Sequence, residues 1–257
     1  MYVSGSASFL RLFTVLLVVL LAGACANVPP EQRVESDPWE PLNRTLYSVN
    51  TAVDKVTLKP LAKGYEKVLP RPVRTGVANV FQNLATPGSA VNNFLQGKPA
   101  SGFTELARFA FNSTLGVGGL FDVASNGGLE ARSEDFGQTA AVWGIPSGPY
   151  VMLPFLGPAT LRDAVTRPID IVSDPLYHYE NTSVRDKLVV LRLIDLRARL
   201  FPAEKLLDDS KDRYITTRES YLQNREFEIY DGDPPEDDDF FDDIFEEEFL
   251  DEGETSD

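Results

Sequence analysis

The most constraining feature of the sequence is an uncharged stretch, Phe136 to Leu161, that lies between Asp135 and Arg162. The stretch is long enough to cross a bilayer, for which a helix needs about 20 apolar residues. It also contains four glycines and four prolines, which interrupt helical hydrogen bonding. Because unpaired backbone groups are costly in hydrocarbon, the stretch must pack on protein or line a polar cavity. A simple transmembrane helix is therefore not expected.

Charge is distributed unevenly along the chain. The formal net charge is −15, but sixteen of the 39 Asp and Glu residues lie between 228 and 257. The preceding residues carry 23 acids and 24 bases, so the body is near neutral and the acidity belongs to a tail. A length of 257 residues with 43% apolar residues is enough for a folded core. No basic patch interleaved with aromatic residues stands out, so nucleic acid is not an expected partner.

Cysteine and histidine are too scarce for most metal and nucleophile chemistry. The chain has one cysteine, Cys25, and one histidine, His178, whereas clusters of Cys and His that hold a metal need three or four ligands. Neither a P-loop, a dinucleotide fingerprint nor a nucleophile elbow occurs, and Ser147 lacks the flanking residues of that elbow. We therefore expect no metal, no cofactor and no catalytic residue. His178 is interpreted as a structural or surface residue.

The first 24 residues resemble a secretory signal peptide. Arg11 precedes thirteen apolar or small residues, a run too short to span a bilayer. The following residues, Ala22 to Cys25, resemble a bacterial lipobox, although Leu21 stands one place earlier than is usual. We predict that Cys25 becomes the lipidated first residue of the mature protein, and ordinary cleavage near Ala24 is the alternative. Residues 25–36 are polar and are predicted to form a tether.

Helical periodicity dominates the body, which we assign to residues 37–227. Apolar residues recur at three- or four-residue spacing, the pattern of helices with one buried face. An Asp cap at Asp37 and proline in the first turn favour a helix that ends before Pro60. The other predicted helices cover 72–84, two short segments split by Gly97 to Pro99, a segment from Ser183 to Pro202, and 203 to about 225.

Between Val77 and Phe121 the composition changes. Only Lys98, Glu105 and Arg108 are charged among these 45 residues, and amides and hydroxyls supply the remaining polarity. Such a segment can be apolar towards lipid on one side and hydrated on the other, or it can form an ordinary buried core. Depletion of charge on all faces favours the membrane-embedded alternative.

The tail from 228 to 257 is predicted to be disordered, because its charge density cannot be offset by a core. Several apolar residues nevertheless recur among the acids at helical spacing. They form either a docking motif that folds on contact with a partner or an apolar remnant in a solvated tail. These residues are Phe240, Phe241, Ile244, Phe245, Phe249 and Leu250.

Four ordered motifs resemble those of the MlaA (VacJ) family of outer-membrane lipoproteins. They are D-P-W-E-P-L-N-R-T-L-Y at 37–47, N-N-F-L-Q-G-K-P at 92–99, R-F-A-F-N-S-T-L-G-V-G-G-L-F-D-V-A at 108–124, and the uncharged stretch that begins at Phe136. Together they span most of residues 37–225. The resemblance implies an all-α fold: a ring of amphipathic helices with a central amphipathic channel and a glycine- and proline-rich hairpin, lying in the periplasmic leaflet of the outer membrane. Ala26, rather than Asp, after the lipidated cysteine also favours the outer membrane.

The resemblance further implies a protein without enzymatic activity. Members of the family remove phospholipids from the outer leaflet and so maintain lipid asymmetry. They associate with trimeric outer-membrane porins and pass lipid to a periplasmic carrier protein. Two alternatives from other classes are an envelope hydrolase acting on lipid or peptidoglycan, and a porin scaffold that transports nothing. A hydrolase would need a nucleophile with a base, or paired carboxylates, and the adjacent Glu134 and Asp135 are no evidence of such a pair.

The resemblance places the hairpin and gate of the channel at 144–149, with the glycines as hinges. The gate candidates are Gly144, Pro146, Gly148 and Pro149. Large apolar residues in and near the uncharged stretch are predicted to pack or to lie at the lipid path or membrane interface. They are Phe94, Trp143, Tyr150, Met152, Leu153 and Phe155.

Overall fold

The computed structural model describes residues 36–235. The predicted signal peptide, Cys25 and nearly all of the predicted tether lie outside the described residues, as does the acidic tail from 236. The chain divides into two compact units, Met1–Tyr221 and Leu222–Asp257. In the second unit, Arg225 pairs with Glu228 at 3.0 Å, and the N–H of Gly232 donates to the carbonyl of Phe227 at 2.8 Å. The elements described below belong to the first unit, except for the end of α11 after Tyr221.

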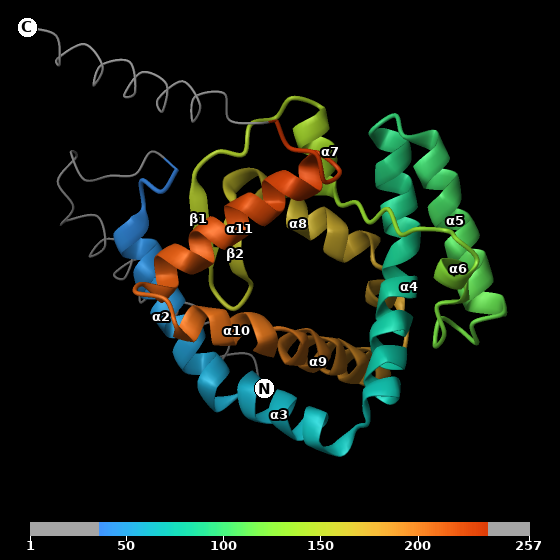
Figure 1. Cartoon of the computed structure of the whole chain (residues 1–257), viewed down its shortest axis with the longest axis horizontal. Coiled ribbons are helices and arrows are strands. Elements are labelled where there is room, and N and C mark those ends of the chain that lie inside the picture. The colour runs from blue at the N-terminus through green and yellow to red at the C-terminus, as the bar shows by residue number, and fades with distance from the viewer. Residues whose placement is uncertain (1–35, 236–257) are drawn as a thin grey trace, which may run out of the picture. The chain divides into compact units, whose positions relative to one another are not determined.

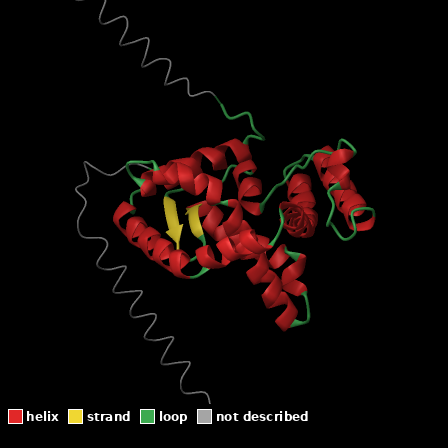
Figure 2. Cartoon of the chain, turned by 60° about the horizontal axis from the view of Figure 1, so that its bottom comes forward, coloured by secondary structure: helices red, strands yellow, loops and turns green. Residues whose placement is uncertain are grey.

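The described residues are mostly helical, with one two-stranded sheet (Figures 1 and 2). None of the helices in this range is long and apolar enough to cross a membrane. The elements are α2 (Glu40–Val56), α3 (Leu58–Val68), α4 (Arg71–Leu95), α5 (Pro99–Thr114), α6 (Val123–Asn126), α7 (Phe136–Val142), β1 (Tyr150–Leu153), β2 (Gly157–Thr160), α8 (Leu161–Ser173), η2 (Pro175–His178), α9 (Thr182–Arg199), α10 (Phe201–Asp208) and α11 (Arg213–Ile229).

The predicted helices are present, but two of their boundaries were wrong. The first helix was expected to end before Pro60, and α2 does so at Val56; Pro60 itself lies in the first turn of α3, where its missing N–H costs nothing. Helix α4 was expected to end at Leu84, yet it continues through Pro87 to Leu95. The single helix expected from Ala203 is two helices, α10 and α11, because the chain turns between them.

The elements of the first unit form a closed circuit of contacts (Figure 1). Helix α2 contacts α3, α3 packs along α9, and α9 contacts α4. From α4 the circuit continues through α7 and α8 to strand β1, which contacts α2 again. Helices α5 and α6 follow α4 and lie on its outer side, away from α9 (Figure 1). The helical ring expected from the sequence is thus confirmed.

An apolar core lies where α3 meets α9. Ala62, Tyr65 and Ala198 are buried there, and partly buried apolar residues surround them. The Tyr65 hydroxyl donates to Asp195 at 3.0 Å. Burial and this hydrogen bond raise the pKa of Tyr65 to about 12, so the tyrosine stays protonated at neutral pH. The surrounding residues are Leu69, Leu191, Ile194 and Phe201.

The two strands form a β-hairpin whose outer edge is covered by α2. Tyr150 pairs with Thr160 and Leu153 with Gly157 in an antiparallel register. The amide of Asn43 donates to the carbonyl of Tyr150 at 3.1 Å and accepts from the N–H of Met152 at 2.9 Å. Two turns further along α2, Asn50 repeats this pattern, donating to the carbonyl of Leu153 at 2.8 Å. Two side-chain amides thus replace the hydrogen bonds of a third strand, and the edge is not left open.

Candidate functional site

The predicted gate, residues 144–149, is an exposed loop between α7 and β1, just before the β-hairpin. Helix α7 begins with a capping box, in which Asp135 accepts from the N–H of Gln138 and Gln138 bonds back to Asp135. The helix ends at Val142, and the φ of 85° at Gly144 allows the N–H of Ile145 to reach the carbonyl of Ala140 at 3.0 Å. The loop therefore leaves the helix in a defined direction.

The loop is held against the start of α8 by its carbonyl groups. The carbonyl of Ser147 accepts from the N–H of Arg162 at 3.0 Å, and that of Pro149 from the N–H of Leu161 at 3.0 Å. The carbonyl of Ile145 accepts from the guanidinium of Arg162, which is itself buried, at 3.3 Å. Gly148 has φ of 65°, and a Cβ there would lie 3.1 Å from the Cβ of Leu161. The loop is exposed, yet it is fixed at both ends.

Four of the six predicted lipid-path residues have accessible side chains, and two do not. Trp143 is 60% exposed, and its indole N–H donates to the carbonyl of Leu95 at 3.1 Å. Phe155 is 67% exposed at the hairpin turn. Phe94, which contacts Phe103 edge to face, is also exposed, and Leu153 is half-buried.

Tyr150 and Met152 are buried, so an interface position for them is corrected to a packing one. Both point to the inner face of β1, because alternate residues of a strand share a face. The ring of Tyr150 contacts Tyr214 and Tyr221 edge to face. Burial is the main reason that the pKa of Tyr150 is raised well above its usual range.

Helix α5 has an inverted distribution of polar and apolar residues. Its only two charged residues, Glu105 and Arg108, are buried together with Asn112. Phe103, on the opposite face, is 65% exposed, and Leu106 and Phe111 are exposed as well. The opposite arrangement, with the apolar face inside, is typical of helices in water-soluble proteins. A large exposed apolar surface marks a site of contact with lipid or with another protein.

The buried polar residues of this arm are held by hydrogen bonds. Arg108 contacts Asp122 at 3.3 Å and Ser125 at 3.0 Å, and also donates to the carbonyl of Leu129. Asn112 donates to Asp122 at 2.9 Å. Burial alone would raise the pKa of Asp122, but the hydrogen bonds and the charge of Arg108 lower it to about 2.

The amides of the charge-poor segment do not form a hydrated face. Asn83, Asn92, Asn93 and Asn112 are buried, which contradicts that part of the expectation from composition. Asn93 donates to the carbonyls of Ser89 at 3.0 Å and of Arg132 at 2.8 Å. These amides therefore fasten helices and connecting segments to one another inside the protein, whereas Phe94, Phe103 and Phe111 are exposed.

Helix α8 repeats the inverted pattern. Arg162 and Asp163 are buried, and Asp163 accepts from the Tyr221 hydroxyl at 2.8 Å. Apolar residues at helical spacing are exposed along the other side of the helix. They are Leu161, Val165, Ile169 and Val172.

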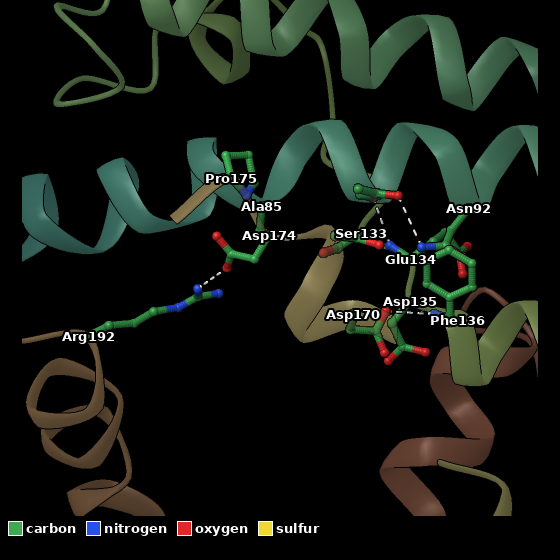
Figure 3. A pocket seen from close by; sticks show the side chains of 13 residues that line it. Ala85, Asn92, Ser133, Glu134, Asp135, Phe136, Asp170, Asp174, Pro175 and Arg192 are labelled. Carbon is green, nitrogen blue, oxygen red and sulfur yellow. Dashed lines mark hydrogen bonds and ion pairs between the residues drawn. The ribbon is translucent and has the colours of Figure 1, made fainter. Parts of the chain in front are cut away.

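A cavity of about 210 Å³ lies between α4, the segment before α7, the end of α8 and α9 (Figure 3). Arg192 of α9 lines one end and forms an ion pair with Asp174. Glu134, Asp135 and Asp170 line the other end (Figure 3). The remaining lining residues are Ala85, Gly88, Ser89, Asn92, Ser133, Phe136, Ser173 and Pro175.

The walls of the cavity are fixed by hydrogen bonds. Asp170 accepts from the N–H of Phe136 at 3.0 Å, which joins α8 to the start of α7. The Ser89 hydroxyl accepts from the N–H of Glu134 at 2.8 Å, and Glu134 pairs with Lys98 at 3.1 Å. The cavity is therefore part of the folded framework, and its charged groups have defined positions.

Sequence reasoning did not find this cavity. Arg192 fell within the helix predicted from Ser183 to Pro202 and was given no role in a site, and Glu134 and Asp135 were considered only as adjacent acids. The residues come from four segments that are distant in sequence, and no local pattern joins them. Among the described residues, no group of three or more His, Cys, Asp or Glu is placed to hold a metal ion. His178 lies at the surface beside Tyr177, with a ring nitrogen 2.6 Å from the carbonyl of Val172.

The fold and the site define a class of protein: a mostly helical ring in which α5 and α8 bury charged residues and expose apolar ones towards lipid or another protein. Residues 35–228 match the model of the MlaA lipoprotein family. The chain belongs to the MlaA lipoprotein family.

Similar proteins support this membership. The chain is 36% identical to the intermembrane phospholipid transport system lipoprotein MlaA of Shigella flexneri over 222 residues, which are 85% of this chain and 88% of the relative. The protein of the same name from Haemophilus influenzae is 31% identical, covering 86% and 91%. A structure solved to explain the maintenance of bacterial outer membrane lipid asymmetry is 38% identical, with a TM-score of 0.66, and covers 76% of this chain and 99% of that one.

Proposed function

We propose that this protein is a lipid-anchored outer-membrane component that removes phospholipids from the outer leaflet. In this proposal it conducts them through its helical ring and passes them to a periplasmic carrier protein. The relatives from Shigella flexneri and Haemophilus influenzae are named intermembrane phospholipid transport system lipoproteins, which supports phospholipid as the substrate. Lipid asymmetry of the outer membrane is the result of such transport.

The inverted helix α5 is the observation that carries the proposal. A helix with buried Glu105 and Arg108 and exposed Phe103 and Phe111 suits an apolar medium on its outer side. Fully burying one such side chain is worth about 1.5–3 kcal/mol, so several together bind a lipid phase firmly. The exposed apolar side of α8 adds to the same surface.

Phospholipid passage needs two kinds of surface at once. Moving a charged headgroup into hydrocarbon is very costly, and each tail methylene left in water costs about 0.8 kcal/mol. A ring with an amphipathic centre satisfies both requirements, because the head follows polar groups while the tails stay on apolar ones. The loop at 144–149 and the hairpin turn with Phe155 stand beside this path as its gate.

Cys25 supplies the lipid anchor, and several acyl chains together hold a protein stably on a membrane. The trimeric porin is the proposed neighbour in the outer membrane, and the carrier is the proposed acceptor of lipid. No bond in the phospholipid is broken in this scheme, so the protein acts as a transporter and not as an enzyme.

The test is the amount of phospholipid at the cell surface. Cells that lack this protein should accumulate phospholipid in the outer leaflet, and the wild-type gene should reverse this. The variant Cys25→Ala should fail to restore asymmetry because the protein leaves the membrane. Release of fatty acid or lysophospholipid by the purified full chain would instead favour a hydrolase.

A scaffold is distinguished from a transporter by the loop. Ile145 is 49% exposed, and Ile145→Asp adds a charge beside the proposed path. If the protein transports lipid, Ile145→Asp should abolish lipid asymmetry and leave porin association unchanged. If the protein is only a scaffold, the same variant should keep both lipid asymmetry and porin association. The matched control is Val68→Asp on α3, where the side chain is 75% exposed and far along the chain from the loop.

A further inference from the structure

We propose that the cavity between α4, α7, α8 and α9 is a binding subsite for the phosphoethanolamine headgroup of a phospholipid. This inference rests on the proposed function and adds a headgroup preference to it. The cavity volume of about 210 Å³ is many times the 10–15 Å³ that a single water molecule needs. A small polar headgroup therefore fits, while the acyl tails remain outside.

The arginine end of the cavity suits a phosphodiester. A guanidinium carries five N–H donors in a planar fork that matches phosphate oxygens. Nη1 of Arg192 bonds to Asp174, and Nε and Nη2 have no hydrogen-bond partner among the residues that the structure describes. The guanidinium carbon lies 5.9 Å from the centre of the Phe81 ring. Two donors are thus held ready at the cavity wall.

The opposite end suits a cation. Glu134, Asp135 and Asp170 line it, and carboxylate oxygens accept the N–H groups of an ammonium. Asp174 is paired with Arg192 and Glu134 with Lys98, so Asp135 and Asp170 leave the lining with an excess of acids, whose field repels a free anion such as inorganic phosphate. A ligand without net charge, carrying phosphate at one end and an amine at the other, avoids this repulsion.

The chemistry of the wall also selects the kind of amine. A primary ammonium has three N–H donors, which carboxylates, hydroxyls and amide oxygens accept. A quaternary ammonium has none and is bound instead by cages of aromatic rings. Phe136 is the one aromatic residue in the lining, whereas Ser89, Ser133 and Ser173 add hydroxyls. The subsite is therefore suited to phosphatidylethanolamine in preference to phosphatidylcholine, and to either in preference to phosphatidylglycerol.

The experiment measures which lipid the purified full chain retains. The protein is equilibrated with detergent micelles that contain equal amounts of phosphatidylethanolamine, phosphatidylglycerol and phosphatidylcholine. It is then recaptured, and the bound lipids are quantified by mass spectrometry. We expect phosphatidylethanolamine to be enriched about tenfold over phosphatidylglycerol, the effect of one or two charge-assisted hydrogen bonds.

Variants and competitors locate the preference in this cavity. Arg192→Gln and Asp170→Asn should each abolish the enrichment while total bound lipid stays unchanged. The matched control Arg185→Gln, on the same helix and paired with Asp186, should keep it. Unchanged circular dichroism confirms folding, and if one variant unfolds, the other decides. Glycerophosphoethanolamine should displace the bound phosphatidylethanolamine, and inorganic phosphate should not.

Three results would overturn the subsite. They are equal retention of the three lipids by the wild type, wild-type enrichment in both folded cavity variants, and equal displacement by inorganic phosphate, which would identify a general anion site. Absence of any retained lipid would contradict the proposed function itself, and it is readily told apart from retention without preference.

Discussion

The α3–α9 pair and the α4–α5 pair are both packed helices, but their interiors differ in kind. Between α3 and α9 the buried residues are mainly apolar, with Ala62, Ala198 and the single carboxylate of Asp195, and Lys63 and Lys67 of α3 are exposed. Helix α5 buries its two charged residues and exposes phenylalanines. The first arrangement is stable in water because burial removes apolar area from water. The second gains nothing from water on its outer side, and its stability depends on polar contacts within.

The difference shows how one chain can meet two media. Close apolar packing holds the α3–α9 pair together, and surface charge keeps the pair soluble. Helix α5 of the α4–α5 pair is fastened to the segment around α6 by a buried network around Arg108, which leaves its outer face free to be apolar. The apolar packing and the polar network can be weakened by separate substitutions, so each pair can be tested by itself.

The largest effect is expected at the buried network. Arg108→Ala leaves Glu105 and Asp122 without their cation in a region where water is scarce, and loss of one partner of such a pair costs about 3–5 kcal/mol. Chemical denaturation should show this loss in the free energy of unfolding. Arg185→Ala, which removes an exposed pair with Asp186, should cost less than about 1 kcal/mol. Equal losses in the two variants would show that the network is not the source of cohesion in the arm.

An intermediate loss of stability is expected from a larger side chain in the apolar seam, the buried core between α3 and α9. Ala62 is fully buried between α3 and α9, and Ala62→Leu should lower the free energy of unfolding by about 1–3 kcal/mol through strain. Ala110→Leu adds the same atoms to the exposed face of α5 and should be nearly neutral. Thermal unfolding of both variants measures the contrast, and a neutral Ala62→Leu would mean that the seam is loosely packed.

The smallest effect concerns pH. The pKa of Asp122 is lowered to about 2 from an ordinary value of 3.8, so its ionised form stabilises the fold above pH 4. This contribution is lost as the pH falls from about 4 to about 2. Asp122→Asn should therefore flatten the decline of melting temperature in that window. Asp186→Asn, at an exposed position, should leave the slope as in the wild type.

Local sequence patterns predicted the helices but not the elements that depend on distant partners. The spacing of Leu42, Leu46 and Val49 was sufficient for α2, since a helix follows from its own residues. A hairpin was expected at 144–149, whereas the two strands lie at 150–160; they are completed by Asn43 and Asn50, which stand more than 100 residues earlier. Of the two alternatives for the uncharged stretch, packing on protein or lining a polar cavity, Tyr150, Met152 and Ala159 follow the first.

The site was predictable only in part. The exposure of Trp143 and Phe155 agrees with their expected place, and the glycines at 144 and 148 do adopt conformations that favour glycine. Their role as hinges stays a prediction, since the loop carbonyls are bonded to α8. Tyr150 is buried against tyrosine rings of α11, and no sequence pattern near Tyr150 predicts this contact. The residues of the cavity wall likewise come together only in the folded chain, so no local pattern predicts the cavity.

The most direct test of the account is the surroundings of position 103 in a membrane. A cysteine introduced by Phe103→Cys on α5 is labelled with an environment-sensitive fluorophore, and Lys63→Cys on α3 carries the same label as a control; under the proposed lipidation Cys25 does not compete, because its sulfur is bound to the lipid through a thioether. In vesicles of phospholipid, brominated acyl chains should strongly quench the label at 103 and should leave the label at 63 bright. Equal quenching at the two positions, or none at 103, would contradict the claim that the inverted face of α5 lies in lipid.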